Sequence, residues 1–197
     1  MKKTAFLFLV GVLVAVLALS CASTGGGKSD QGGFKGGFAW GAFTDAASGG
    51  SSTITLIEDV EMIDGEPQMT YTISGEITSQ YEYGYCGWYA RPDEETLQKL
   101  MTAKSFSFRV KGDGAPYQAM LTTSDIEDAC YFRSNFNTKK DQVITVTIRV
   151  GSLQQPDDWG IKKKFNQELA DQLQWQTTNN GRPGTFNLKI WDLRVYN

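Results

Sequence analysis

The chain has 197 residues, of which 41% are hydrophobic and 21% are charged, and it contains three cysteines and no histidine. Without histidine there is no imidazole base, no Ser-His-Asp triad and no histidine-ligated metal, and three cysteines cannot form an all-cysteine zinc site. The 19 basic residues nearly balance the 22 acidic ones, without a charged tail, which argues against nucleic-acid binding. The length fits one ordinary domain with an appendage, and the composition favours a binding or assembly module over an enzyme.

The first 20 residues have the composition of a secretory signal peptide. Lys2 and Lys3 form a positive segment, and an almost unbroken apolar run follows from Thr4 to Leu19. Cys21 stands where a bacterial lipoprotein signal places its acylated cysteine, although Ala18 occupies the position where such signals prefer leucine. We therefore predict a lipid on Cys21 that attaches the protein to a membrane of the bacterial cell envelope. The alternative is ordinary signal cleavage, which leaves a soluble secreted protein.

Residues 21–37 are rich in glycine and serine and contain a single phenylalanine. Such a segment buries too little apolar surface to offset its ordering entropy, so we predict a flexible tether followed by one domain over residues 38–197. That domain contains Cys86 and Cys130, and an exported protein can keep disulfides. Two interpretations stay open for this pair, a disulfide bridge or two buried thiols.

Alternation of apolar and polar residues along short runs predicts β-strands that each have one buried face. The strongest and then the weaker runs are 106–110, 144–150, 186–190, 53–57, 69–77, 83–89, 117–123, 131–136 and 173–178. Turn signals rich in Gly, Asn and Asp separate them. Helices are predicted only for 93–102 and, more weakly, for 164–173. This pattern predicts an all-β protein, an antiparallel β-sandwich of jelly-roll topology with one or two short helices.

Two segments place aromatic rings among polar groups. The four tyrosines of segment 80–89 would lie on one face of a strand, and loop 154–160 carries Trp159 beside two carboxylates. Flat rings of this kind suit sugars, because the ring covers the apolar C–H face while amides and carboxylates bond the hydroxyls. The alternative is that these rings cover the edges of the core.

Catalysis is not predicted. A glycoside hydrolase needs two carboxyl groups at a defined separation across a cleft, and the acidic residues here are scattered along the chain. Neither cysteine has a histidine to activate it as a nucleophile.

Several motifs follow one another in a characteristic order along residues 38–197. They are Trp40…Asp45…Gly49-Gly50-Ser51-Ser52, Ser74-Gly75-Glu76-Ile77, Tyr83-Gly84-Tyr85-Cys86-Gly87, the run from Phe106 to Gly114, the run from Tyr131 to Thr138, and the run from Gly184 to Ile190. This order is similar to that of galactose-binding-like β-sandwiches, in particular carbohydrate-binding module family 11 and the complex I intermediate-associated 30-kilodalton protein family. Family 11 modules bind β-glucan chains, without catalysis, in a groove on their concave sheet.

The resemblance implies a set of groove residues in this chain. They are Tyr85, Asp128, Asp158, Trp159 and Asp171. Where the family has a further groove tyrosine, this chain has Thr177, and the loss of one ring contact would weaken stacking by about 1 kcal/mol. Many of these sandwiches also hold a structural calcium ion between their first and last strands. Asp45 and Asp192 are the candidate ligands here, and the alternative is a site with no metal.

Together these features predict a non-catalytic, lipid-anchored β-sandwich that binds β-glucan or another envelope glycan. The alternative partner is an envelope protein, since members of the intermediate-associated family act as assembly factors. The two differ in the surface they require, because sugar binding needs exposed rings along a groove and protein binding needs a flatter apolar patch.

Overall fold

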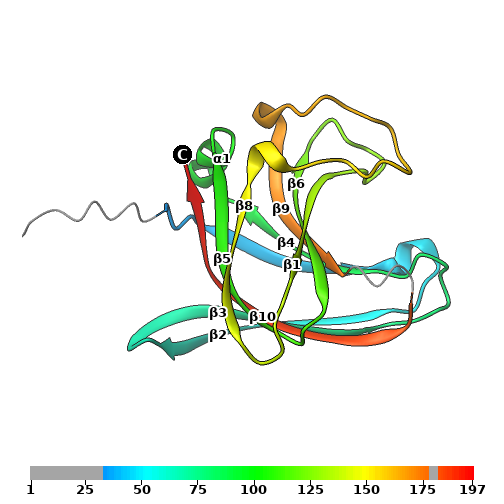
Figure 1. Cartoon of the computed structure of the whole chain (residues 1–197), viewed down its shortest axis with the longest axis horizontal. Helices are drawn as coiled ribbons and strands as arrows, with labels where there is room; N and C mark the ends of the chain where they lie inside the picture. The colour runs from blue at the N-terminus through cyan, green and yellow to red at the C-terminus, as the bar shows by residue number, and fades with distance from the viewer. Residues whose placement is uncertain (1–32, 178–181) are drawn as a thin grey trace, which may run out of the picture. The chain divides into compact units, whose positions relative to one another are not determined.

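Two five-stranded antiparallel sheets make up the computed structural model of the chain, which describes residues 33–177 and 182–197 (Figure 1). The strands are β1 (Phe38–Thr44), β2 (Thr53–Ile63), β3 (Glu66–Ile77), β4 (Cys86–Pro92), β5 (Ser105–Gly112), β6 (Pro116–Thr123), β7 (Phe132–Asn137), β8 (Val143–Arg149), β9 (Ala170–Thr177) and β10 (Gly184–Tyr196). One sheet has the strand order β1-β4-β9-β6-β7 and the other β2-β3-β10-β5-β8. The predicted all-β antiparallel sandwich is confirmed.

The core lies between the two sheets and follows the alternation seen in the sequence. On β5, Phe106, Phe108 and Val110 are fully buried, while Arg109 points to the other face. Trp175 on β9 lies in the same layer, with its ring centroid 5.3 Å from that of Trp40 and 5.5 Å from that of Phe108. Period-two patterning therefore places one set of side chains in the core and leaves the opposite set on the outer faces.

The predicted helix near residue 93 is confirmed as α1 (Glu94–Leu100). Asp93 is its N-cap, since the carboxylate accepts a hydrogen bond from the Thr96 amide at 2.8 Å. The second predicted helix, 164–173, is wrong: only a short 3-10 turn, Gln167–Leu169, precedes β9. Two of its apolar residues, Ala170 and Leu173, belong instead to the buried face of that strand.

The folded unit begins before the predicted boundary at Phe38. Phe34 forms a β-bridge with Val195, and the amide of Gly37 donates to the hydroxyl of Thr96 at 2.9 Å. Through these contacts residues 33–37 pack on the sandwich and lie in the same compact unit as β10. The predicted signal peptide, Cys21 and the rest of the tether lie outside the described residues. Among the residues that are described, no helix has the length and apolarity needed to cross a bilayer.

Cys86 and Cys130 are free thiols, so the predicted disulfide is wrong and the alternative of two buried thiols holds. Each side chain is directed to a different carbonyl: Cys86 Sγ donates to Thr53 at 3.4 Å, and Cys130 Sγ donates to Trp159 at 3.2 Å. Burial, followed by the nearby charge of Asp45, raises the pKa of Cys86 to about 12. This thiol stays protonated at neutral pH and is not a nucleophile.

Candidate functional site

A groove with a volume of about 1110 Å³ lies on the outer face of the β1-β4-β9-β6-β7 sheet. Its floor consists of the outward-facing residues of β6, β7 and β9, because the alternate residues of those strands fill the core. The strand register places Gln118 between Gln176 and Asn135, and in the next row Met120 between Gln174 and Arg133. The floor is therefore rich in amides, which can both donate to and accept from ligand hydroxyls.

Tyrosine rings form one wall of the groove. The ring centroids of Tyr81 and Tyr83 are 6.0 Å apart, those of Tyr81 and Tyr85 are 6.4 Å apart, and both pairs meet edge to face. Tyr83 is 65% exposed. These residues come from the loop between β3 and β4 and not from a strand, so the predicted strand 83–89 begins only at Cys86. The predicted groove residue Tyr85 does line the groove.

Asp45 holds this wall in place. Its carboxylate is fully buried and accepts hydrogen bonds from the Ser52 amide at 3.1 Å, the Ser52 hydroxyl at 2.6 Å and the Tyr85 amide at 3.3 Å. The amide of Asp45 in turn donates to the carbonyl of Tyr85 at 3.2 Å. A buried carboxylate satisfied in this way fixes the backbone that carries the tyrosine.

Trp159 and Asp158 form the opposite wall, in the long loop between β8 and β9, seen at the upper right of Figure 1. The Trp159 side chain is 43% exposed, which distinguishes it from the core tryptophans. Asp128 also lines the groove, and it ties this loop to the loop between β6 and β7. Its oxygens accept from the Ile161 amide at 2.6 Å and the Cys130 amide at 3.0 Å. These two amides hold the pKa of Asp128 below its usual range, so the carboxylate that joins the two loops stays charged at neutral pH.

Arg133 provides a cation on the groove floor that the sequence did not single out. Its guanidinium donates to the Gln118 side chain at 3.2 Å, and it interacts electrostatically with Asp158. Burial lowers the pKa of Arg133, and the charge of Asp158 opposes that effect. The groove therefore places amides, an arginine and a carboxylate beside aromatic rings, so it can both pack against and hydrogen-bond a ligand.

Asp171 is placed differently from the other predicted groove residues. It is exposed at the start of β9 and does not line the groove itself. Tyr131 does line the groove, and Asp171 is close enough to affect it. Burial, followed by the charges of Asp171 and Asp128, raises the pKa of the Tyr131 phenol. The structure thus brings together four of the five predicted residues and leaves the fifth, Asp171, outside the lining of the groove. Thr177, in place of the additional tyrosine, lines the groove and hydrogen-bonds to the backbone of Cys86.

The structure does not bring Asp45 and Asp192 together as calcium ligands. Asp45 lies near the Gly184 end of β10. The Ser52 hydroxyl that donates to Asp45 also accepts from the Thr78 amide, and Thr78 directly follows Ile77, the partner of Gly184 in the sheet. Asp192 is roughly 26 Å farther along that strand and is already paired with Lys35 and Arg194. No group of three or more acidic, cysteine or histidine side chains suited to a metal occurs within residues 33–177 and 182–197. These donor sets do not fit a shared calcium ion.

The family model for complex I intermediate-associated protein 30 matches residues 31–190. The chain belongs to this family. This member of the complex I intermediate-associated protein 30 family has no significant match among curated proteins. It is similar in structure to the family 11 carbohydrate-binding module of the cellulosomal cellulase Lic26A-Cel5E of Clostridium thermocellum, with a TM-score of 0.56 and 16% identity over 83% of this chain and 90% of that one. A family 30 carbohydrate-binding module gives a TM-score of 0.48 with 14% identity over 72% and 82% of the two chains. A family 4 carbohydrate-binding module gives a TM-score of 0.42 with 15% identity over 80% of this chain and 85% of that one.

Proposed function

We propose that this protein is a non-catalytic module that binds a β-glucan or another envelope glycan in the groove described above. The observation that carries the proposal is the groove itself, in which the Tyr85 and Trp159 walls face an amide-rich floor with Arg133. The family 11 module, whose fold this chain shares, is described as carbohydrate-binding, and this supports the same role. Asp128 and Asp158 would bond ligand hydroxyls near Trp159, with Asp171 acting at the rim.

The exposed ring of Trp159 gives a direct test. We expect the purified protein to bind β-glucan oligosaccharides or envelope glycans in calorimetric titrations, and Trp159→Ala to weaken that binding about tenfold through loss of stacking. The melting temperature should stay nearly unchanged, because the ring is 43% exposed. Glu127→Ala, a change of an exposed residue in the neighbouring loop that does not line the groove, is the matched control. A protein that gives no heat with any glycan of the panel would count against the proposal.

Binding of an envelope protein, as an assembly factor, is the second candidate function. The family match favours it, since the family is described as associated with intermediates of complex I. The long β2–β3 hairpin also carries four exposed large apolar side chains, which are Ile57, Val60, Met62 and Met69. Two results would favour this function over sugar binding. No glycan of the panel would bind, and changing Val60 and Met62 to serine would abolish capture of an envelope protein.

We also propose that lipid chains on Cys21 attach the domain to a membrane of the bacterial cell envelope. The support is the apolar run that ends just before this cysteine. Mass spectrometry of the native protein should show a mature N-terminus at Cys21 that carries the mass of acyl chains, and Cys21→Ala should release the protein from membranes. An unmodified N-terminus at Cys21 or Ala22 would remove this part of the proposal.

A further inference from the structure

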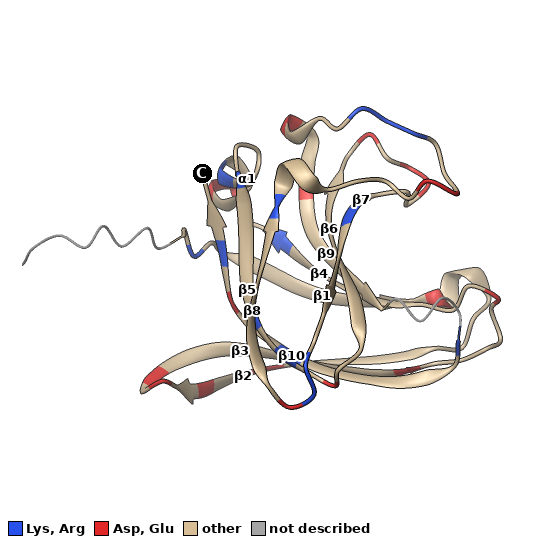
Figure 2. Cartoon of the chain, in the orientation of Figure 1, with Lys and Arg blue, Asp and Glu red and all other residues tan. Residues whose placement is uncertain are grey.

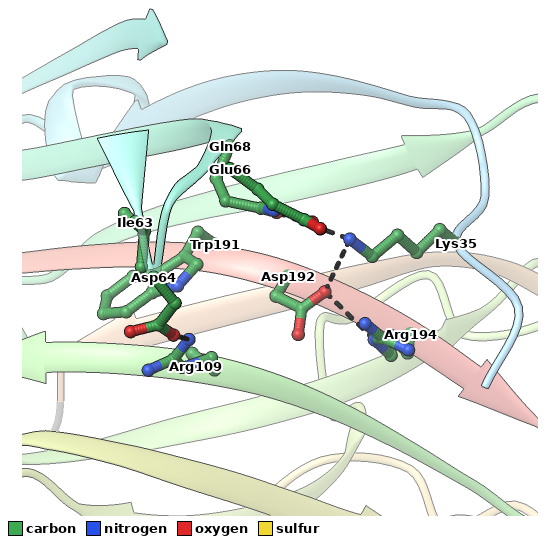
Figure 3. Close-up of a pocket in the computed structure, with 9 residues that line it drawn as sticks. All are labelled: Lys35, Ile63, Asp64, Glu66, Gln68, Arg109, Trp191, Asp192 and Arg194. Carbon is green, nitrogen blue, oxygen red and sulfur yellow. Dashed lines mark hydrogen bonds and ion pairs between the residues drawn. The ribbon is translucent and has the colours of Figure 1, made fainter. Parts of the chain in front are cut away.

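A second, smaller cavity lies on the other sheet, outside the groove. This basin has a volume of about 280 Å³ and is bounded by the tip of the β2–β3 hairpin and by strands β5 and β10 (Figure 3). Its lining includes Arg109 from β5, Trp191 and Asp192 from β10, Asp64 from the hairpin turn, and Lys35. None of these residues lines the groove, so the basin is a separate feature of the molecule.

Trp191 presents an unsatisfied donor in the basin. Its side chain is only 3% exposed, and its indole N–H has no hydrogen-bond acceptor among the described residues. The indoles of Trp88 and Trp175 also lack acceptors, but these rings lie in the apolar core between the sheets and line neither cavity. A buried donor without an acceptor is destabilising, so the Trp191 N–H favours a ligand that supplies an oxygen.

A β-bulge gives the basin its polar side. The pairing of β10 with β5 shifts register between Trp191 and Arg194, and Asp192 in this bulge has a φ of 52°. Bulges of this kind redirect a side chain, and here Asp192 Oδ1 meets Lys35 at 3.1 Å and Arg194 at 3.0 Å. The dashed lines in Figure 3 mark both pairs.

A third ion pair of the basin covers the indole. The guanidinium of Arg109 lies 5.2 Å from the ring centroid of Trp191 and donates to Asp64 at 2.7 Å. Because Arg109 covers one face of the ring and the residue is only 3% exposed, the ring is not available for stacking with a ligand. The unpartnered N–H is the group through which it would contact one. A ligand of the basin must therefore be recognised through hydrogen bonds.

The charges of the basin point to a neutral ligand. Three cations, Lys35, Arg109 and Arg194, are balanced by three carboxylates, Asp64, Glu66 and Asp192. Each ion pair sets donors and acceptors side by side, which suits hydroxyl groups because every hydroxyl both donates and accepts. We propose that the basin is a second ligand site, which binds a small neutral polyhydroxyl molecule the size of one sugar ring, with a ligand oxygen accepting from Trp191 Nε1–H.

Nitrogen-15 NMR of the full chain tests this site separately from the groove. The chain has five tryptophans, so their indole N–H signals can be assigned by single Trp→Phe changes. On titration with methyl β-D-glucopyranoside, we expect the Trp191 signal to shift and saturate, while the Trp88 and Trp175 signals stay in place. The Trp159 signal reports on the groove. A shift of the Trp159 signal alone overturns the proposal of a ligand site in the basin and leaves the proposed function standing. A saturating shift of Trp191 alone supports the basin even where the groove fails.

A variant then tests the role of the indole donor. Trp191→Phe keeps a ring and removes the N–H, and we expect it to weaken binding about tenfold, followed by the saturating backbone shift of Gln68. Trp159→Phe is the matched control and should leave this affinity within about twofold. Unchanged affinity in Trp191→Phe, or binding of methyl β-D-glucuronide in place of the neutral glycoside, overturns the assignment. If Trp191→Phe does not fold, the shift of the unaltered Trp191 signal still decides the question.

Discussion

Trp175→Ala is expected to lower the free energy of unfolding by about 3–5 kcal/mol. The indole is fully buried on the central strand β9, where it stacks on Trp40 and meets Phe108 edge to face. Its removal leaves a cavity between the two sheets that a rigid sandwich closes only in part, so both the lost burial and the void destabilise the fold. Chemical denaturation followed by circular dichroism measures the change.

Trp159→Ala is the matched control for this experiment, because it removes the same side chain from an exposed position. Its free energy of unfolding should fall by less than about 0.5 kcal/mol. Similar losses in the two variants would show that Trp159 is part of the core, and would undermine its role as a sugar platform.

Asp45→Ala is expected to lower the free energy of unfolding by about 3 kcal/mol or more and also to weaken glycan binding. The change leaves the buried amides of Ser52 and Tyr85 without their acceptor. Since the Tyr85 amide is one of these groups, the tyrosine wall of the groove should lose its fixed position as well. Denaturation and glycan calorimetry on the same samples measure both effects.

Glu82→Ala provides the comparison, because Glu82 is an exposed carboxylate in the loop that carries the tyrosines. It should change stability by less than about 0.5 kcal/mol and leave glycan affinity unaltered. If Asp45→Ala destabilises the protein but binds glycan normally, Tyr85 does not depend on Asp45 and this account of the wall is wrong.

Most of the fold could be predicted from the sequence because several of its strands, β5 and β8 above all, alternate apolar and polar residues. The run 106–110 became β5, since Phe106, Phe108 and Val110 are all directed to the core. β1 escaped prediction for a physical reason: its outward residues include Ala39 and Gly41, so no polar residue marks the exposed face. Residues 164–173 resembled a helix because their few apolar residues are compatible with either periodicity.

The groove was predictable in its aromatic rings and in two of its carboxylates, but not in its floor. Tyr85 and Trp159 stand in conspicuous segments, and the family resemblance added Asp128 and Asp158. Arg133 was missed, since it reaches the floor through the pairing of β7 with β6. Only the pairing register of the two strands places Arg133 beside Gln118. The polar residues at alternate positions of 117–123 and 131–136 could have indicated a polar outer face. The prediction of a Cys86–Cys130 disulfide was wrong because an even number of cysteines in the domain does not show which side chains meet.

Strand β2 forms one border of its sheet, and no other strand within residues 33–177 and 182–197 pairs with its outer side. Glu58 and Asp59 are exposed there, and Figure 2 shows further acidic residues towards the tip of the hairpin. A second copy whose own β2 paired here in a register centred on these residues would place like charges opposite each other, which disfavours a dimer through this border. Opposite charges across a strand pair are favourable, so this border suits a strand that carries lysine or arginine better than it suits a second copy of itself.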